Sequence, residues 1–193
     1  MRQLLFFSNN KNKIIEIKKI FKKFNLKVLS LKDVKISNEP EESGGSFEEN
    51  ARIKSYYGFN KTGIPCFADD SGICIETLNW KPGVLSKRFL KDFKNKEACF
   101  KSIIESIRNN GKKNAYFKTS INLTINNDQN IIFNGRINGK ISNQIKGNFG
   151  FGYDPIFIPQ NYNKTLAELS TKQKNEISHR SIAVTKLINF LFN

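Results

Sequence analysis

Apolar residues near the start of the chain change from strand-like to helix-like spacing. Positions 4–8 (LLFFS) form a short apolar run of strand length, and 26–31 (LKVLSL) form another. Between them lie apolar residues at helical spacing: Ile14, Ile17, Ile20, Phe21 and Phe24. The chain therefore opens with a strand, a tight polar loop and a helix, which is half of a βαβ unit.

A second helix and a longer strand are predicted after an acidic, turn-rich loop at 36–47 (ISNEPEESGGSF). Ser46 is a suitable N-cap with Glu49 as its capping-box partner, so a helix should begin there and end near Gly58 or Gly63. The stretch 66–76 (CFADDSGICIE) then has strand character. We expect this strand to be interrupted or to end at its two adjacent aspartates, before a Pro-Gly loop.

The second half of the chain predicts a helix, a hairpin and two closing helices. Positions 95–110 are amphipathic and stop at Gly111, while 115–126 and 130–142 alternate apolar with polar residues around an Asn-Asn-Asp turn. A glycine-rich stretch leads into a short strand, and the final helix covers 177–192. The pattern predicts an α/β fold with a mixed, partly antiparallel, elongated sheet and flanking helices. It indicates one domain, 1–193, with two lobes around a central cleft.

Composition excludes several classes of protein. The 193 residues include 38% apolar residues and 17 Phe, enough for a core, but no apolar run is long enough to cross a bilayer. The start of the chain does not resemble a secretory signal. Three cysteines without C-x-x-C spacing argue against a disulfide framework and a zinc site. We therefore expect a soluble protein of the reducing cytoplasm with no membrane partner.

The charge of +15 leaves two explanations open. Lysines are spread along the whole chain together with abundant Asn and Ile, which is typical of A/T-rich codon usage, but they could also attract phosphates. A nucleic-acid-binding module should show clustered lysines with interleaved exposed aromatics. The aromatics here have mostly core spacing, so nucleic acid is not the expected partner. Whether the basic surface has a second role is left open.

Asp69 and Asp70 stand side by side in the stretch ADDSG. One interpretation is structural, with one aspartate capping an Asp-Ser-Gly turn and the other in solvent. The other is a divalent-metal site, since Mg²⁺ prefers one or two carboxylates with waters and substrate phosphates, and one carboxylate could accept a proton from attacking water. Glu41 and Glu42 in the acidic loop are candidate further ligands.

Three other segments could contact a nucleotide. The loop SNNKNK (8–13) precedes a helix, where free backbone N–H groups suit phosphate; turn residues with solvated lysines are the alternative. The stretch 147–155 (GNFGFGYDP) places Phe151 and Tyr153 as flat faces for a base, or as core aromatics. In ISHRS, Arg180 offers donors for carbonyl or phosphate oxygens, whereas a lone histidine such as His179 is more often an ordinary surface residue.

The order of these segments resembles the inosine triphosphate pyrophosphatase family. SNNKNK, FEENARIK, ADDSG, GFGYDP and SHR occur here in the family's order, from Ser8 to Arg180. The resemblance implies a homodimer of two-lobed chains that uses Mg²⁺ to hydrolyse ITP, dITP and XTP to the monophosphate and pyrophosphate, which cleanses the nucleotide pool.

The resemblance also implies roles for individual residues. Asp70 would be the proton acceptor, and it would hold Mg²⁺ with Asp69 and Glu42. The implied triphosphate and sugar contacts are Ser8, Asn9, Asn10, Lys11, Asn12, Lys13, Lys54 and Ser71. The implied base pocket comprises Phe151, Gly152, Tyr153, Asp154, Lys174, His179 and Arg180. Donors such as Arg180 would favour a purine with a 6-keto group over adenine, since an amino group leaves a buried donor unmatched.

Two positions depart from the family pattern. Asn9 replaces a glycine in the first motif, and its side chain could crowd the phosphates. Leu85 and Lys87 replace the usual Tyr and Ala of the Pro-Gly loop. The alternatives are a pyrophosphatase of the same architecture that acts on other modified nucleotides, a nucleotide binder without catalysis, and the nucleic-acid-binding module.

Overall fold

The computed structural model describes residues 3–22, 24 and 26–192. The strands are β1 Gln3–Phe6, β2 Lys27–Leu29, β3 Cys66–Ile75, β4 Lys81–Pro82, β5 Asn114–Thr124, β6 Asn130–Ile141 and β7 Phe157–Pro159. The helices are α1 Lys11–Phe21, α2 Phe47–Thr62, α3 Ser86–Lys91, α4 Lys96–Asn110, α5 Thr171–Ile177 and α6 His179–Phe192. The expected α/β class is confirmed.

Six strands follow one another in the sheet in the order β2-β1-β3-β5-β6-β7, and β4 pairs with β3. β1 is parallel to both β2 and β3, while β3–β4 and β6–β7 are antiparallel pairs. The sheet is therefore mixed, as the alternation of helices, strands and a hairpin predicted. None of the helices in the described ranges is both long and apolar enough to cross a membrane.

The chain divides into two compact units. Unit 1 comprises 1–70, 119–134 and 183–193, and unit 2 comprises 71–118 and 135–182. β3, β5 and β6 each contribute residues to both units, and the boundary in β3 falls at the peptide bond between Asp70 and Ser71. That the units act as one domain around a cleft stays a prediction.

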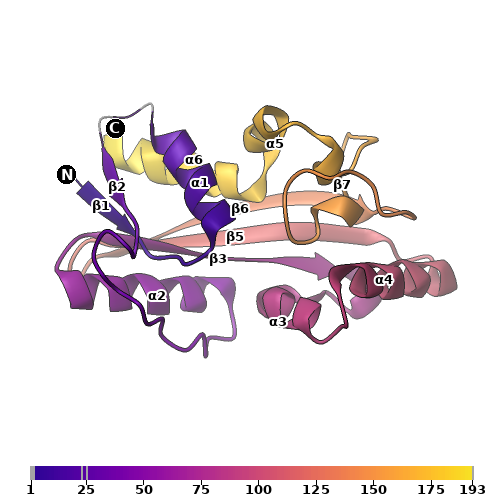
Figure 1. Ribbon diagram of the computed structural model, residues 1–193, viewed down its shortest axis with the longest axis horizontal. Helices are drawn as coiled ribbons and strands as arrows, with labels where there is room; N and C mark the ends of the chain where they lie inside the picture. The colour runs from indigo at the N-terminus through magenta and orange to yellow at the C-terminus, as the bar shows by residue number, and fades with distance from the viewer. Residues whose placement is uncertain (1–2, 23, 25, 193) are drawn as a thin grey trace. The chain divides into compact units, whose positions relative to one another are not determined.

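Unit 1 has a hydrophobic core on each face of its part of the sheet. Leu4, Phe6 and Phe67 pack with residues of α1 and α6, whereas Leu5, Cys66 and Ala68 belong to the cluster on the other face, beside α2 residues. Figure 1 shows α1 and α2 on opposite sides of the strands. Because side chains alternate along a strand, β3 presents even-numbered and odd-numbered residues to different helices.

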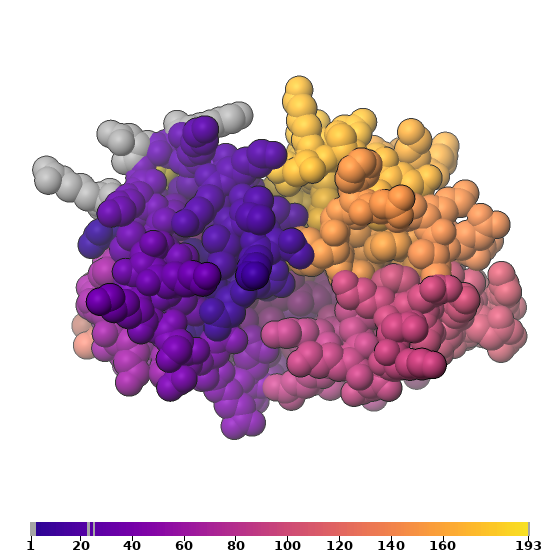
Figure 2. All heavy atoms as spheres, viewed as in Figure 1, coloured from indigo at the N-terminus to yellow at the C-terminus, as the bar shows by residue number. Residues whose placement is uncertain are grey.

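Unit 2 is built around one core that α4 covers. Its largest members include Ile73 and Ile75 of β3, Phe100 and Ile103 of α4, and Phe157 of β7. The residues of α3 and α4, in pink, form the lower surface of this unit in Figure 2. Tyr153 also lies in this core, where its ring contacts Phe100.

Two sequence predictions of element boundaries are wrong. β3 neither ends nor breaks at the aspartates but continues without interruption from Cys66 to Ile75. The closing helix begins at His179 rather than at 177, and Lys174 lies in the preceding helix α5. Ser178 separates the two helices because its backbone is extended, with φ −69° and ψ 151°.

Candidate active site

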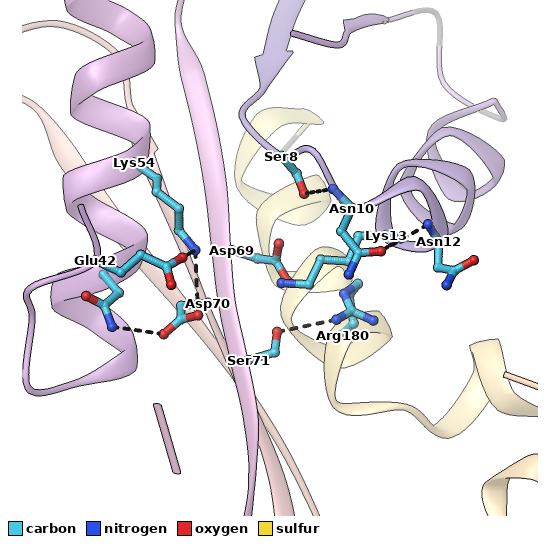
Figure 3. Close-up of polar contacts among 11 residues, drawn as sticks. Ser8, Asn10, Asn12, Lys13, Glu42, Lys54, Asp69, Asp70, Ser71 and Arg180 are labelled. Atoms are coloured by element: carbon cyan, nitrogen blue, oxygen red, sulfur yellow. Dashed lines mark hydrogen bonds and ion pairs between the residues drawn. The ribbon is translucent and has the colours of Figure 1, made fainter. Parts of the chain in front are cut away.

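In unit 1, Asp69 and Asp70 are each paired with a separate lysine. Lys13 Nζ of α1 lies 2.9 Å from Asp69 Oδ2, and Lys54 Nζ of α2 lies 3.6 Å from Asp70 Oδ1. Figure 3 shows the two lysines approaching β3 from opposite sides. The pairing follows from strand alternation, since Asp69 shares the face of Phe67 and Asp70 shares the face of Ala68. Neighbouring carboxylates thus point apart, and each has its own counter-charge.

Glu42 and Asp70 converge on one cationic nitrogen. Lys54 Nζ lies 2.6 Å from Glu42 Oε1 as well as 3.6 Å from Asp70 Oδ1. Burial alone would lower the pKa of Lys54, but the negative charges of Asp70, Glu42 and Asp69 outweigh it and raise this pKa. Lys54 therefore stays charged, and the structure accommodates a cation between oxygens from two distant parts of the chain.

Asp70 is buried, and burial raises the pKa of its carboxyl above the usual value. The charges of Lys54 and Lys13 and a hydrogen bond from Asn50 oppose this rise, while the negative charge of Glu42 adds to it. A carboxyl with a raised pKa binds a proton more readily than an ordinary aspartate, which suits a proton acceptor. A proton acceptor must be ionised, so an activity that depended on Asp70 would be lost as the pH falls through that raised pKa.

The loop before α1 has the features of an anion-binding helix start. The Asn10 side chain caps the helix by accepting from the N–H groups of Asn12 and Lys13, at 3.0 and 3.3 Å. Ser8 Oγ accepts from the N–H of Asn10 at 3.2 Å. Asn9 and Lys11 are exposed, so the loop presents polar and cationic groups beside the first turn of the helix.

Asn9 does not need the backbone freedom of glycine. Among the described non-glycine residues, positive φ angles occur at Lys35, Asn79, Trp80 and Asn161. Asn9 is outside that set, so its replacement of the family's glycine adds no left-handed strain.

In unit 2, Phe151 lies beside two cations. Lys174 Nζ is 4.6 Å and the Arg180 guanidinium carbon 5.5 Å from the centre of the Phe151 ring. Arg180 is buried, and its Nη2 donates to Ser71 Oγ at 3.4 Å. The half-buried ring and the two cations form a flat, electropositive surface that suits an electron-rich base.

The turn that carries Phe151 is built around Asp154. Asp154 Oδ2 accepts from the Phe151 N–H at 2.7 Å and from Lys174 Nζ at 2.7 Å. Gly150 and Gly152 have φ angles of +78° and +64°, which side chains rarely adopt. A Cβ added at Gly150 would meet Asp154 Oδ2 at 2.1 Å. The glycines therefore allow the turn to close on the carboxylate.

Three expected roles do not fit the placement of the residues. Asp69 faces away from the point where Glu42 and Asp70 converge, and no described set of three His, Cys, Asp or Glu side chains could hold a metal together. Tyr153 is buried and donates to the Ser86 carbonyl at 2.9 Å, so its ring is not a free face for a base. His179 is buried and stacked on Phe117 at 4.7 Å, rather than on the surface.

Two residues that the sequence did not single out support the site. Asn50 of α2 donates from Nδ2 to Asp70 Oδ2 at 3.2 Å and accepts from the Gly44 N–H at 2.8 Å. Its position four residues before Lys54 puts both on one helix face, a signal that the sequence does contain. Ser86 Oγ accepts from the Ile73 N–H at 2.9 Å, a contact across 13 residues that no local pattern predicts.

Comparisons with known proteins identify the family of this chain. A curated relative from Flavobacterium psychrophilum, named dITP/XTP pyrophosphatase, is 42% identical over 99% of this chain and 100% of its own. A solved HAM1 protein from Coxiella burnetii has a TM-score of 0.90 at 32% identity, covering 99% of this chain and 98% of its own. The Staphylococcus aureus Ham1 structure has a TM-score of 0.87 at 34% identity, covering 98% of each chain. Residues 4–190 match the model of the Ham1 family, and the chain belongs to that family.

Proposed function

We propose that this protein hydrolyses non-standard purine nucleoside triphosphates of the dITP, ITP and XTP type to the monophosphate and pyrophosphate. Relatives named dITP/XTP pyrophosphatase match its full length at up to 42% identity among those compared. The observation that carries the proposal is the buried Asp70, held by Lys54 and Asn50 beside Glu42. This arrangement supplies a proton acceptor beside a position for a cation.

The chemistry assigned to Asp70 is proton transfer. A water molecule attacks the α-phosphorus, its proton passes to the Asp70 carboxylate, and the α–β bond breaks with its electron pair on the departing pyrophosphate. Asn50 and Lys54 position the carboxylate through their contacts at 3.2 and 3.6 Å. In unit 1, Lys13 and the capped start of α1 bind phosphate oxygens.

Glu42 and Asp70 fit Mg²⁺. Their oxygens are the hard ligands that this ion prefers, it commonly takes only one or two carboxylates, and they already converge on a cationic group. When bound, Mg²⁺ would neutralise phosphate charge. Asp69 contributes through Lys13, not as a metal ligand, since it lies on the other face of β3.

We assign base recognition to Phe151, Lys174 and Arg180 of unit 2. Phe151 offers its half-buried ring to the purine, and Arg180 donates to a 6-keto oxygen. The 6-amino group of adenine would leave that buried donor unmatched. Tyr153 and Asp154 support the turn, and His179 positions Arg180 at the start of α6 by stacking on Phe117.

Two properties complete the proposal. We infer a homodimer from the family resemblance, which light scattering would report as twice the 22.2 kDa chain mass. We infer a cytoplasmic location because Cys66, Cys74 and Cys99 are all buried free thiols, as expected in a reducing compartment.

The test is a parallel hydrolysis assay of ITP, dITP, XTP, ATP, GTP and CTP with Mg²⁺, with separate detection of pyrophosphate and single phosphate. The proposal expects pyrophosphate from the first three, little from the others, and loss of turnover when EDTA removes the metal. Release of single phosphate would show a different cleavage site. Preferential hydrolysis of CTP would contradict the assignment of the base pocket.

A further inference from the structure

A hollow on unit 2 lies outside every residue assigned above. It has a volume of about 540 Å³, within the range of ligand sites, and its lining includes Trp80, Tyr116, Tyr162 and Arg136. We call it the aromatic hollow. Trp80 and Tyr162 are 46% and 37% exposed, although large aromatic side chains usually bury most of their surface.

Strand alternation explains how these groups come together. Ala115 and Phe117 of β5 belong to the core of unit 2, so Tyr116 between them faces the opposite side. On the neighbouring strand β6, Arg136, Asn138 and Lys140 are all exposed. β7 pairs with β6 next to them, as Figure 1 shows.

The aromatic groups are already arranged for stacking. The rings of Trp80 and Tyr116 lie 5.5 Å apart at 33°, and the Arg136 guanidinium carbon is 3.7 Å from the centre of the Tyr116 ring. Arg136 Nε donates to Asn138 Oδ1 at 2.8 Å, which fixes the plane of the guanidinium. Aromatic rings and guanidinium planes are the surfaces on which unstacked bases bind.

A second, basic hollow of about 360 Å³ adjoins the first, with which it shares Lys140 and Ile158. Its lining adds Lys113 and Lys146 and the polar residues Ser142, Asn143 and Gln144. In the described structure neither lining contains an acidic side chain; Glu76, which accepts from the Asn114 N–H at 3.3 Å, lies beside them. Base-stacking surfaces thus continue directly into a cluster of lysines.

We propose that this face binds single-stranded nucleic acid, with a base against Trp80 and Tyr116 and the following phosphates on Lys113, Lys140 and Lys146. A single-stranded nucleic acid carries planar bases beside charged phosphates. The two adjoining hollows offer matching surfaces, one lined by aromatic rings and the other by lysines. A net charge of +15 would draw a polyanion to the protein at long range. The sequence disfavoured a nucleic-acid partner because its lysines are spread along the chain and its aromatics have mostly core spacing, whereas the sheet brings several of both together on this face.

Trp80 is the single tryptophan of the chain, so its fluorescence reports on this face alone. The experiment titrates the full-length protein with a dodecamer of deoxythymidine at several salt concentrations, with excitation at 295 nm. We expect quenching with a Kd of roughly 1–100 μM at physiological salt and tighter binding at lower salt. The slope of log K against log salt should be about −2, at about −0.7 for each of three neutralised phosphates.

Variants test the assignment with a labelled dodecamer and fluorescence anisotropy. Trp80→Asn removes the ring but tolerates the φ of +64°, and it should weaken binding about tenfold. Lys113→Gln and Lys140→Gln should each reduce the salt slope by about 0.7. Matched controls are Lys91→Gln, an exposed lysine of α3, and Tyr56→Ala, an exposed aromatic of α2, and both should bind like the parent.

Several outcomes would overturn the proposal. They are an absence of quenching, a salt slope near zero, and equal weakening by the control variants. Equal quenching by thymidine monophosphate at the same nucleotide concentration would show a site for free nucleotides instead of a strand. Loss of quenching on self-association of the protein would identify this face as a contact between copies. None of these results depends on triphosphate hydrolysis. The hydrolysis assay therefore tests the proposed function independently of nucleic-acid binding.

Discussion

At the scale of single residues, the carboxylates of Asp69 and Asp70 avoid each other because β3 runs through both without a break. Each therefore meets its own lysine, at 2.9 Å for Lys13–Asp69 and 3.6 Å for Lys54–Asp70. The two aspartates are adjacent in sequence but lie in different environments. In the proposed mechanism Asp70 accepts the proton, and Asp69 holds Lys13, the lysine assigned to phosphate.

Replacement of Asp70 by asparagine should strongly reduce catalysis while preserving the fold. Asn fills the same volume but cannot accept the proton, and a general base typically contributes about 10²–10⁴-fold to the rate. We expect kcat for ITP to fall about 10³-fold in Asp70→Asn. The control is Asp128→Asn, an exposed carboxylate in the β5–β6 turn, which should leave kcat unchanged. Activity of Asp70→Asn within tenfold of the parent would remove Asp70 from the catalytic role.

Asn9 should be a nearly neutral departure from the family pattern. Its side chain is exposed and its φ is not positive, so a glycine gains nothing from backbone freedom. We expect Asn9→Gly to change the KM for ITP by less than about twofold, since substitutions that remove no contact usually cost under ~0.5 kcal/mol. Steady-state kinetics would test this. A tenfold fall in KM would show that the Asn9 side chain obstructs the phosphates.

At the scale of elements, α2 is the support on which Asn50 and Lys54 are held, and its start is fixed by a reciprocal capping box. Ser46 Oγ accepts from the Glu49 N–H at 3.2 Å, while Glu49 Oε2 accepts from the Ser46 N–H at 3.2 Å. The far end stops at Gly63, whose φ is +67°. The start was predicted and the end was narrowed to Gly58 or Gly63, because capping chemistry is local and can be recognised from spacing.

Ser46→Ala should lower stability without affecting chemistry directly. Loss of an N-cap typically costs about 1 kcal/mol, which for a chain of this size lowers Tm by about 2–4 °C. Calorimetry of this variant would measure the shift, and Ser43→Ala in the preceding loop is the matched control. An unchanged Tm in Ser46→Ala would mean that tertiary packing alone fixes the start of α2.

The turn around Asp154 should be sensitive to a single methyl group. A Cβ at Gly150 would lie 2.1 Å from Asp154 Oδ2, so Gly150→Ala must displace the carboxylate that holds Phe151 and Lys174. We expect the KM for ITP to rise about tenfold, or ~1.4 kcal/mol, with a smaller change in kcat. Gly111→Ala has a similar φ of +72° with open space around it, and should leave KM unchanged. Equal kinetics in both variants would separate this turn from substrate binding.

The elements also show where sequence patterns stop being informative. The hairpin of β5 and β6, the amphipathic α4 and the two closing helices follow from period and turn chemistry. The uninterrupted course of β3 through Asp69 and Asp70 does not follow from these patterns, because adjacent charges normally end a buried strand. The strand can continue because tertiary contacts with lysines of α1 and α2 balance the two charges. The burial of His179 was missed for the same reason, since Phe117 lies far away in sequence, while for Tyr153 the sequence left both a base-stacking face and a place in the core open.

At the scale of the whole molecule, the three cysteines are distributed over both units and all are buried. Burial raises the pKa of Cys99 from 9.0 to about 11 and raises those of Cys66 and Cys74 as well. A raised thiol pKa means less thiolate at a given pH. At pH 8 a thiol of pKa 11 is ionised in about one molecule in a thousand, a hundredfold less than an ordinary one.

Ellman's reagent should therefore distinguish the folded chain from the unfolded one. At pH 8 we expect almost no release of chromophore from the native protein over minutes, and three equivalents after unfolding in urea. Raising the pH from 8 toward 10 should accelerate the slow native reaction by about tenfold per pH unit, because every pH in this range lies below the raised pKa of about 11 of Cys99, where the thiolate fraction grows tenfold per unit. Rapid reaction of one equivalent in the native protein would show that a thiol is accessible.

Because side chains alternate along β3, the candidate active site should be sensitive to insertions and deletions, which differ in effect from single substitutions. Each of Asp69 and Asp70 finds its lysine only because the number of residues between them and Cys66 sets the face to which each points. Insertion or deletion of one codon in that interval would move each carboxylate to the other face while leaving every side chain of the site in the protein. A gene that tolerates many amino-acid exchanges elsewhere should therefore keep the length of this segment constant.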